Sequence, residues 1–288
     1  MPNRPNNIKV VTNPNKTQDG FGENFKMLIL SVMYAELNDC KFVYSPFKDL
    51  EHNYHEDPDY IEKKEKLINF TRNFEHVSDE PHHILETFEL LRFFHLNVEQ
   101  CAKSKSLQII RLLFRAGKPN PFADSSSYVN IAIHIRRMNN HDYHRTGGNR
   151  QSVLPGMDAP NELYMGLIQQ LYSLHPNARF HIYSQGSAAE FRMFDNEYTV
   201  LHLNEPIEDT FTQMVFADIL ITAPSALSYV AAFLSLNTIY YIEFCNLPLP
   251  GWNIVSGYKS TRAKHEFLMP MLTPVYYDPN TDQFHVIK

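Results

Sequence analysis

The second half of the chain alternates short apolar runs with amphipathic segments at helical spacing. The short runs predict buried strands and the longer segments predict helices. The expected strands are 129–135, 179–184, 199–203, 218–222 and 238–242, and the expected helices are 161–174, 188–194, 207–216 and 225–234. Strands that alternate with helices of this length indicate βαβ units, and therefore a parallel sheet with right-handed crossovers.

The first half carries fewer strand signals and longer helical ones. Strands are expected at 8–11 and 41–44, and helices at 25–37, 57–74, 83–96 and 98–116. Residues 117–127 are rich in turn formers and predict the connection between two domains. We therefore expect an α/β protein of two Rossmann-like lobes, residues 1–124 and 125–288, with parallel sheets flanked by helices and a cleft between the lobes.

The amino-acid composition limits which partners and which cellular environment the chain suits. The 288 residues carry a net charge of −6, which gives no broad basic field for nucleic acid. Three cysteines, Cys40, Cys101 and Cys245, are odd in number and widely separated, so we expect core thiols and no disulfide framework. No apolar run is long enough to cross a bilayer, and the polar start lacks the apolar core of a signal peptide. These features predict a soluble, cytoplasmic protein.

The strand at 129–135 ends in chemistry suited to anions. Ile131, Ile133 and Ile135 share one face, because side chains alternate along a strand, while His134 and Arg136 lie on the other. Arg137 follows where the strand leaves the sheet. Ligands of open α/β sheets bind beyond the carboxyl ends of the strands, and guanidinium groups suit phosphate. The alternative is a strand end whose arginines pair with acids or extend into solvent.

Two further turns resemble anion-binding loops. Gly20 and Gly22 lie between a strand and a helix, where glycine lets a ligand approach the backbone; the alternative is a plain tight turn. Ser225 opens a helix after the apolar run 218–222, and its hydroxyl could bind phosphate or simply cap the helix.

Two acidic or histidine-containing segments could bind a metal. His141, Asp142 and His144 are of the right types for a metal or for acid–base chemistry, but no further ligand has suitable spacing, so a solvated loop or a single general base is the alternative. Asp57-Pro58-Asp59 matches the Asp-x-Asp pattern of metal-dependent sugar-nucleotide enzymes. It precedes a charged helical segment, however, and Pro58 fits a helix start.

Taken together, these pieces resemble the fucosyltransferase superfamily, which includes α1,2-, α1,6- and protein O-fucosyltransferases. Its His-x-Arg-Arg-x-Asp motif corresponds to 134–139, its glycine turn to 20–24 and its serine-rich helix start to 223–226. The resemblance implies a GT-B fold, GDP-L-fucose as donor, a glycan acceptor, inversion at the anomeric carbon, and no cofactor or metal. Residues 1–124 would form the acceptor side and 125–288 the nucleotide-sugar side.

The resemblance also implies roles for individual residues. The expected catalytic residues are Arg136, Arg137 and Asp142, and the expected donor-binding residues are His134, Arg136, Asp209, Ser225, Gly20 and Gly22. Asn139 stands where the family has aspartate, so Asp142 or His141 would supply the carboxylate or base. Two alternatives remain open: a GT-B enzyme that uses another sugar nucleotide, and a non-catalytic carbohydrate-binding homologue.

Overall fold

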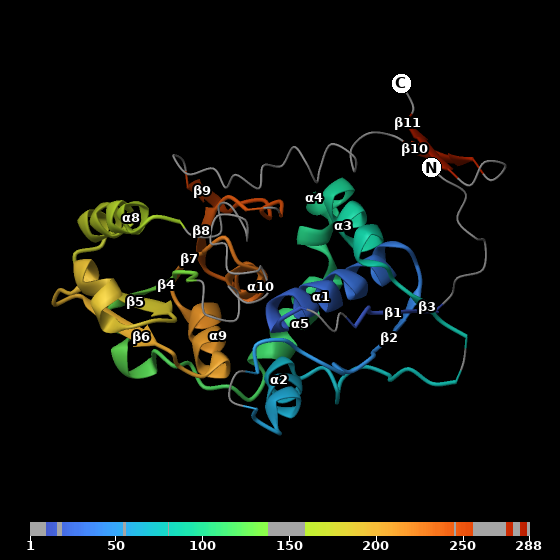
Figure 1. Cartoon of the computed structure of the whole chain (residues 1–288), viewed down its shortest axis with the longest axis horizontal. Coiled ribbons are helices and arrows are strands. Elements are labelled where there is room, and N and C mark those ends of the chain that lie inside the picture. Colours follow the sequence, from blue (N-terminus) through green and yellow to red (C-terminus); the bar gives the residue numbers. More distant parts are fainter. Residues whose placement is uncertain are drawn as a thin grey trace.

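The computed structural model describes residues 10–15, 19–53, 56–79, 81–137, 159–244, 246–255, 275–278 and 283–286. It contains two α/β lobes, with helices α1, α9 and α10 lying between the large sheet of the second lobe and the small sheet of the first (Figure 1). The fold class expected from the sequence, parallel sheets flanked by helices in two lobes, is confirmed. Within the described ranges, no helix has the length and apolar character needed to cross a bilayer.

The second lobe is built on a parallel sheet of six strands among the described residues, in the order β6-β5-β4-β7-β8-β9. This is the strand order of a Rossmann fold. The strands are β4 (Val129–His134), β5 (Ala178–Ser184), β6 (Thr199–Leu203), β7 (Ile219–Ile221), β8 (Thr238–Ile242) and β9 (Asn253–Val255). The helices are α8 (Asn161–Leu174), η2 (Ala188–Phe194), α9 (Ile207–Phe216) and α10 (Ala226–Leu234).

The two faces of β4 pack against different helices, as its alternating pattern predicts. Ile131 and Ile133 join a core with residues of α8 and η2, whereas Ala132 joins the core on the α9 and α10 face. All three side chains are fully buried. Strand β4 is central in the sheet, because it pairs with β5 and β7. Helices cover both of its faces, and a continuous apolar run is the pattern expected for such a strand.

The first lobe has a smaller sheet than the second lobe and consists mainly of helices. Its three described strands, in the order β2-β1-β3, are β1 (Val10–Thr12), β2 (Lys41–Val43) and β3 (His83–Ile84). Its helices are α1 (Phe21–Leu37), α2 (Tyr60–Ile68), α3 (Thr87–Leu96), α4 (Val98–Lys103) and α5 (Lys105–Arg115), followed by the short η1 (Ala123–Ser125). Strands β10 (Val275–Asp278) and β11 (Gln283–Val286) form an antiparallel pair.

A single apolar core joins the two lobes. It includes Val11 and Phe25 of the first lobe and Phe211 and Leu220 of the second. The Phe211 ring lies 5.3 Å from Phe21, 6.1 Å from Phe25 and 5.5 Å from Phe114, measured between ring centroids. Along these helices, the space between the two sheets is therefore filled by shared apolar side chains.

Several element boundaries differ from the sequence prediction. Helix α1 begins at Phe21 and contains Gly22, because Gly20 is already its N-cap. The segment expected as one helix over 98–116 is two, separated at Ser104, whose hydroxyl caps α5. Helix α2 ends at Asn69, which adopts a left-handed conformation with φ 61°. Helix α8 begins at Asn161 as expected, with Pro160 as its N-cap.

The cysteine prediction is confirmed in part. Cys101 is a buried free thiol, and Cys40 is a half-buried free thiol. Cys245 lies outside the described residues.

Candidate functional site

The second-lobe sheet has a topological switch point between β4 and β7. From β4 the chain winds outward through β5 and β6, and it then returns to the other side of β4 as β7. Ile133 of β4 pairs with Ile221 of β7, so the two strands leave the sheet side by side. The carboxyl edge at such a point is where open α/β sheets bind ligands. It carries His134 and Arg136 on one strand end and the Thr222–Ser225 turn on the other.

His134 is a buried polar group without a described partner. Its side chain ends β4, the residue is 7% exposed, and its Nδ1 atom makes no hydrogen bond to any described residue. Burial, followed by the nearby charge of Arg136, lowers the pKa of His134 to about 3. The imidazole is therefore neutral at pH 7. An unpaired buried polar atom costs free energy, which a ligand that pairs with it would recover.

The two arginines after β4 have different partners. The Arg137 guanidinium donates to Oδ1 of Asn161, at the start of α8, and lies over the Phe191 ring of η2, 5.5 Å from its centroid. Arg136 donates from Nη1 to the carbonyl oxygen of Arg137. Arg137 is thus held against the α8 face of the sheet, whereas the charge of Arg136 acts on His134.

The start of α10 forms the other side of the switch point. Ser225, 7% exposed, caps the helix by accepting a hydrogen bond from the Leu227 amide at 3.3 Å. The capping interpretation of this serine is therefore confirmed. Among the described residues, the amides of Ala226 and Ser228 have no acceptor, and they lie at the positive end of the helix dipole.

The first turn of α1 packs directly against the first turn of α10. A Cβ atom added to Gly22 would lie 2.6 Å from the Leu227 amide nitrogen and 2.8 Å from the Leu227 Cα. Gly22 therefore permits a close approach between two backbones of the protein itself. Gly20 is different, because a Cβ there would meet the His52 ring at 2.5 Å. The N-terminal ends of two helices, one from each lobe, consequently meet beside the end of β4.

Other expected site residues either make no contact with His134 and Arg136 or lie outside the described residues. Asp209 is exposed in the first turn of α9 and makes no hydrogen bond or ion pair to His134 or Arg136. Asp142, together with His141, His144 and Asn139, lies outside the described residues. The roles expected for Asp209 and Asp142 stay predictions.

The Asp-x-Asp segment is part of a helix start. Asp57 accepts the Asp59 amide at 3.0 Å and pairs with Lys63 at 2.6 Å, and the hydrogen bond and ion pair to Lys63 lower the pKa of Asp57. The helix-start interpretation is thus confirmed for this segment. Within the described ranges, no group of three or more histidine, cysteine, aspartate or glutamate side chains is placed to hold a metal ion.

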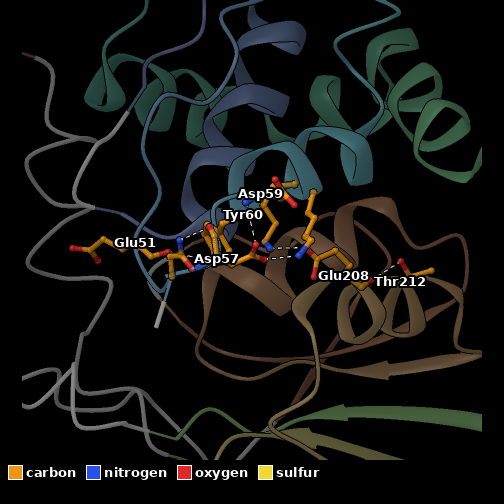
Figure 2. Close-up of polar contacts among 9 residues, drawn as sticks. Glu51, Asp57, Asp59, Tyr60, Glu208 and Thr212 are labelled. Atoms are coloured by element: carbon orange, nitrogen blue, oxygen red, sulfur yellow. Dashed lines mark hydrogen bonds and ion pairs between the residues drawn. The ribbon is translucent and has the colours of Figure 1, made fainter. Parts of the chain in front are cut away.

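An ion pair between the lobes was missed by the sequence analysis. Lys64 of α2 has a side chain only 2% exposed, donates to Glu208 of α9 at 2.6 Å, and lies over the Tyr60 ring at 3.8 Å. Figure 2 shows Glu208 directed from α9 toward the helix that carries Tyr60. Burial lowers the pKa of Lys64. The spacing of Tyr60, Lys64 and Ile68 along one helix face was the available signal for this buried lysine.

A second buried lysine lies near the start of α1. Lys26 is 4% exposed, pairs with Glu23 at 2.8 Å and donates to Asn246 at 3.2 Å. Both ring nitrogens of the nearby His95 are buried without a described partner, and burial together with the Lys26 charge lowers the pKa of His95 to about 4. The Lys26–Asn246 hydrogen bond ties α1 to the segment after β8.

The sequence matches no protein-family model, and no curated protein matches it. Among solved structures, the chain is similar to POFUT1 in complex with GDP, with a TM-score of 0.44 and 10% identity over 82% of this chain and 98% of that chain. It is also similar to E. coli heptosyltransferase WaaC with ADP-2-deoxy-2-fluoro heptose, with a TM-score of 0.43 and 12% identity over 85% and 91%. The E. coli ADP-heptose lps heptosyltransferase II gives 0.37 and 13% over 91% and 98%. Scores below 0.5 at such identities leave the activity of this chain undefined.

Proposed function

We propose that this protein is a glycosyltransferase of GT-B type that uses a nucleotide-activated sugar, with GDP-L-fucose as donor. The observation that supports this proposal best is the convergence at the switch point. Arg136, the unpartnered His134 and the free amides at the start of α10 lie at one sheet edge, where the first turn of α1 joins them. The second lobe would bind the nucleotide, and residues 1–124 would face the acceptor.

The chemistry of each group suits a different part of such a donor. A neutral imidazole offers one donor and one acceptor nitrogen, which fits the polar edge of a nucleobase better than a phosphate. Arg136 and the amides of Ala226 and Ser228 offer positive charge and N–H donors, which fit a diphosphate. Asp209, if α9 carries it to the base, would accept the two N–H donors of guanine.

The proposed reaction breaks the bond between the anomeric carbon and the diphosphate oxygen. The acceptor hydroxyl attacks from the opposite face, its proton passes to a base, and the configuration inverts. Charge grows on the leaving diphosphate as the bond breaks, so a fixed cation there lowers the barrier. Arg136 would supply that charge, and Arg137, held by Asn161 and Phe191, would fix the end of β4. Asp142 stays the predicted base.

Ligand binding is tested first, because it needs no acceptor. The full chain is titrated with GDP, UDP and ADP and with their sugar conjugates while its melting temperature is followed. A ligand present at 100 times its Kd stabilises the folded state by about 2.7 kcal/mol, which is several degrees for a chain of this size. Stabilisation by GDP-L-fucose and GDP above UDP and ADP compounds is expected. No stabilisation by any nucleotide would refute the proposal.

Catalysis is tested through Arg136. Donor hydrolysis, measured as release of free fucose from GDP-L-fucose, should fall about 10²–10³-fold in Arg136→Ala. Arg136→Lys should also be impaired, because an ammonium group lacks the planar fork. Arg192→Ala, an exposed arginine of the same lobe, is the matched control and should retain activity. Wild-type hydrolysis by Arg136→Ala would contradict the role given to this residue, and nucleotide binding without any turnover would favour the non-catalytic alternative.

A further inference from the structure

A second surface of the large sheet, at the edge opposite to the switch point, has features of a binding site. A cavity of about 210 Å³ lies at the amino ends of the first three strands, where β4 begins at Val129, β5 at Ala178 and β6 at Thr199. The polar and aromatic residues that line it are Tyr128, Tyr172, Asn177, Arg179, Glu197 and Tyr198. None of them takes part in the proposed donor site.

The aromatic residues of this cavity form flat surfaces. Tyr172 and Tyr198 stack with ring centroids 4.3 Å apart and an interplanar angle of 23°, and both stay partly exposed. Tyr128 is 44% exposed, and the Arg179 guanidinium lies over its ring at 5.3 Å. The electron-rich face of an aromatic ring attracts the weakly positive C–H groups of a ligand.

The charged residues of this cavity are opposite in sign, and the contact of Arg179 with the Tyr128 ring leaves its N–H donors available. Arg179 and Glu197 both line the space, yet neither side chain makes a hydrogen bond or ion pair to a described residue. A carboxylate accepts from hydroxyl groups and a guanidinium donates to oxygen atoms. The carboxylate beside the single cation also repels phosphate, so the lining favours a neutral, hydroxyl-rich ligand over a nucleotide.

We propose that this cavity is a secondary carbohydrate-binding site that holds one sugar ring of a glycan. Its volume equals that of about seven water molecules, which suits a single hexose ring and is small for a nucleotide. The sugar ring would stack on the Tyr172–Tyr198 pair, while Arg179 and Glu197 would bind its hydroxyl groups. Strand β4 has six residues, which places this site about 20 Å from the switch point. The sugar held here is therefore not the one that reacts.

Saturation-transfer NMR on the full chain tests the proposal with defined probes. Methyl α-L-fucoside, methyl β-D-galactoside and methyl β-D-N-acetylglucosaminide are measured one at a time, without GDP and then with GDP at saturation. At least one glycoside should give a signal that GDP does not remove. That signal should be about five-fold weaker or more in Arg179→Ala and in Tyr172→Ala. Tyr172→Phe, which preserves the ring, and Arg192→Ala, an exposed arginine of the same lobe, should bind as the wild type does.

The outcomes separate this site from the donor site. Absence of a glycoside signal, displacement by GDP, or equal signals in all variants would overturn the proposal. A signal from AMP or UMP that depends on Arg179, with none from the glycosides, would overturn it in favour of a nucleotide site. Failure of GDP to bind would refute the proposed donor and leave a GDP-independent, Arg179-dependent glycoside signal as support for this one.

Discussion

Replacement of Gly22 by alanine should separate the two helices that meet at the proposed site. In a solvated helix, the change from glycine to alanine stabilises a protein by about 0.5–1 kcal/mol, because alanine loses less backbone entropy on folding. At Gly22 the new methyl group would lie 2.6–2.9 Å from backbone atoms of Ala226 and Leu227. Backbone cannot rotate away as a flexible side chain can, and overpacking costs about 1–3 kcal/mol. The strain exceeds the helix gain, so a net loss of about 1–2 kcal/mol is expected.

Gly166 provides the matched control. It lies within α8, and an added Cβ would meet no atom within 4 Å. The same substitution there should stabilise the protein by about 0.5–1 kcal/mol. Urea unfolding of both variants at pH 7, followed by circular dichroism, measures the difference in the free energy of unfolding. Gly22→Ala should also weaken GDP binding, because α10 would shift. If Gly22→Ala were as stable as Gly166→Ala, the close packing of α1 on α10 would be refuted.

Three further predictions concern charge. Glu208→Gln should lower the free energy of unfolding by about 2 kcal/mol, because it leaves Lys64 buried without its anion. Adding Lys64→Met should restore part of that loss in the same urea assay. If the single variant lost no stability, the ion pair between the lobes would be refuted. The pKa values of His95 and His181 are lowered to about 4 and that of His134 to about 3, mainly by burial. Below pH 6.5 the unfolded chain therefore binds more protons than the folded chain. The free energy of unfolding should fall as the pH drops from about 6.5 toward 4, with a slope of up to about 1.4 kcal/mol per pH unit for each histidine. Unfolding curves that coincide at pH 6.5 and 4.5 would contradict this. Donor hydrolysis should be unchanged by EDTA, as the expected metal-independent chemistry requires, and activity that needs added Mn²⁺ or Mg²⁺ would overturn that expectation.

The sequence predicts the second lobe well because its central strands, β4 and β7, are buried on both faces. Apolar runs such as 129–135 have few alternatives when helical segments separate them, and all the strands and helices expected between 129 and 242 are present within one or two residues of their expected bounds, the segment 188–194 as a 3-10 helix. The break at Ser104 was harder to predict, because apolar periodicity continues across it and only the serine cap marks the new helix.

The candidate site was predictable in its residues more than in its contacts. The alternation after Ile131 places His134 and Arg136 on one face, but the separate anchoring of Arg137 depends on Asn161 and Phe191, which are distant in sequence. Gly22 shows the same limit: the sequence indicates a need for close approach there, and only the structure identifies α10 as what approaches.

The aromatic junction around Phe211 has a consequence for how the chain could be divided. Aromatic rings from α1, α5 and α9 pack against one another there. A cut of the chain at the η1 turn would therefore leave each half with a large exposed apolar surface. Halves expressed separately would aggregate, whereas halves expressed together could reassemble through the aromatic junction around Phe211. The lobes are partners in one cooperative fold, and neither is an autonomous module.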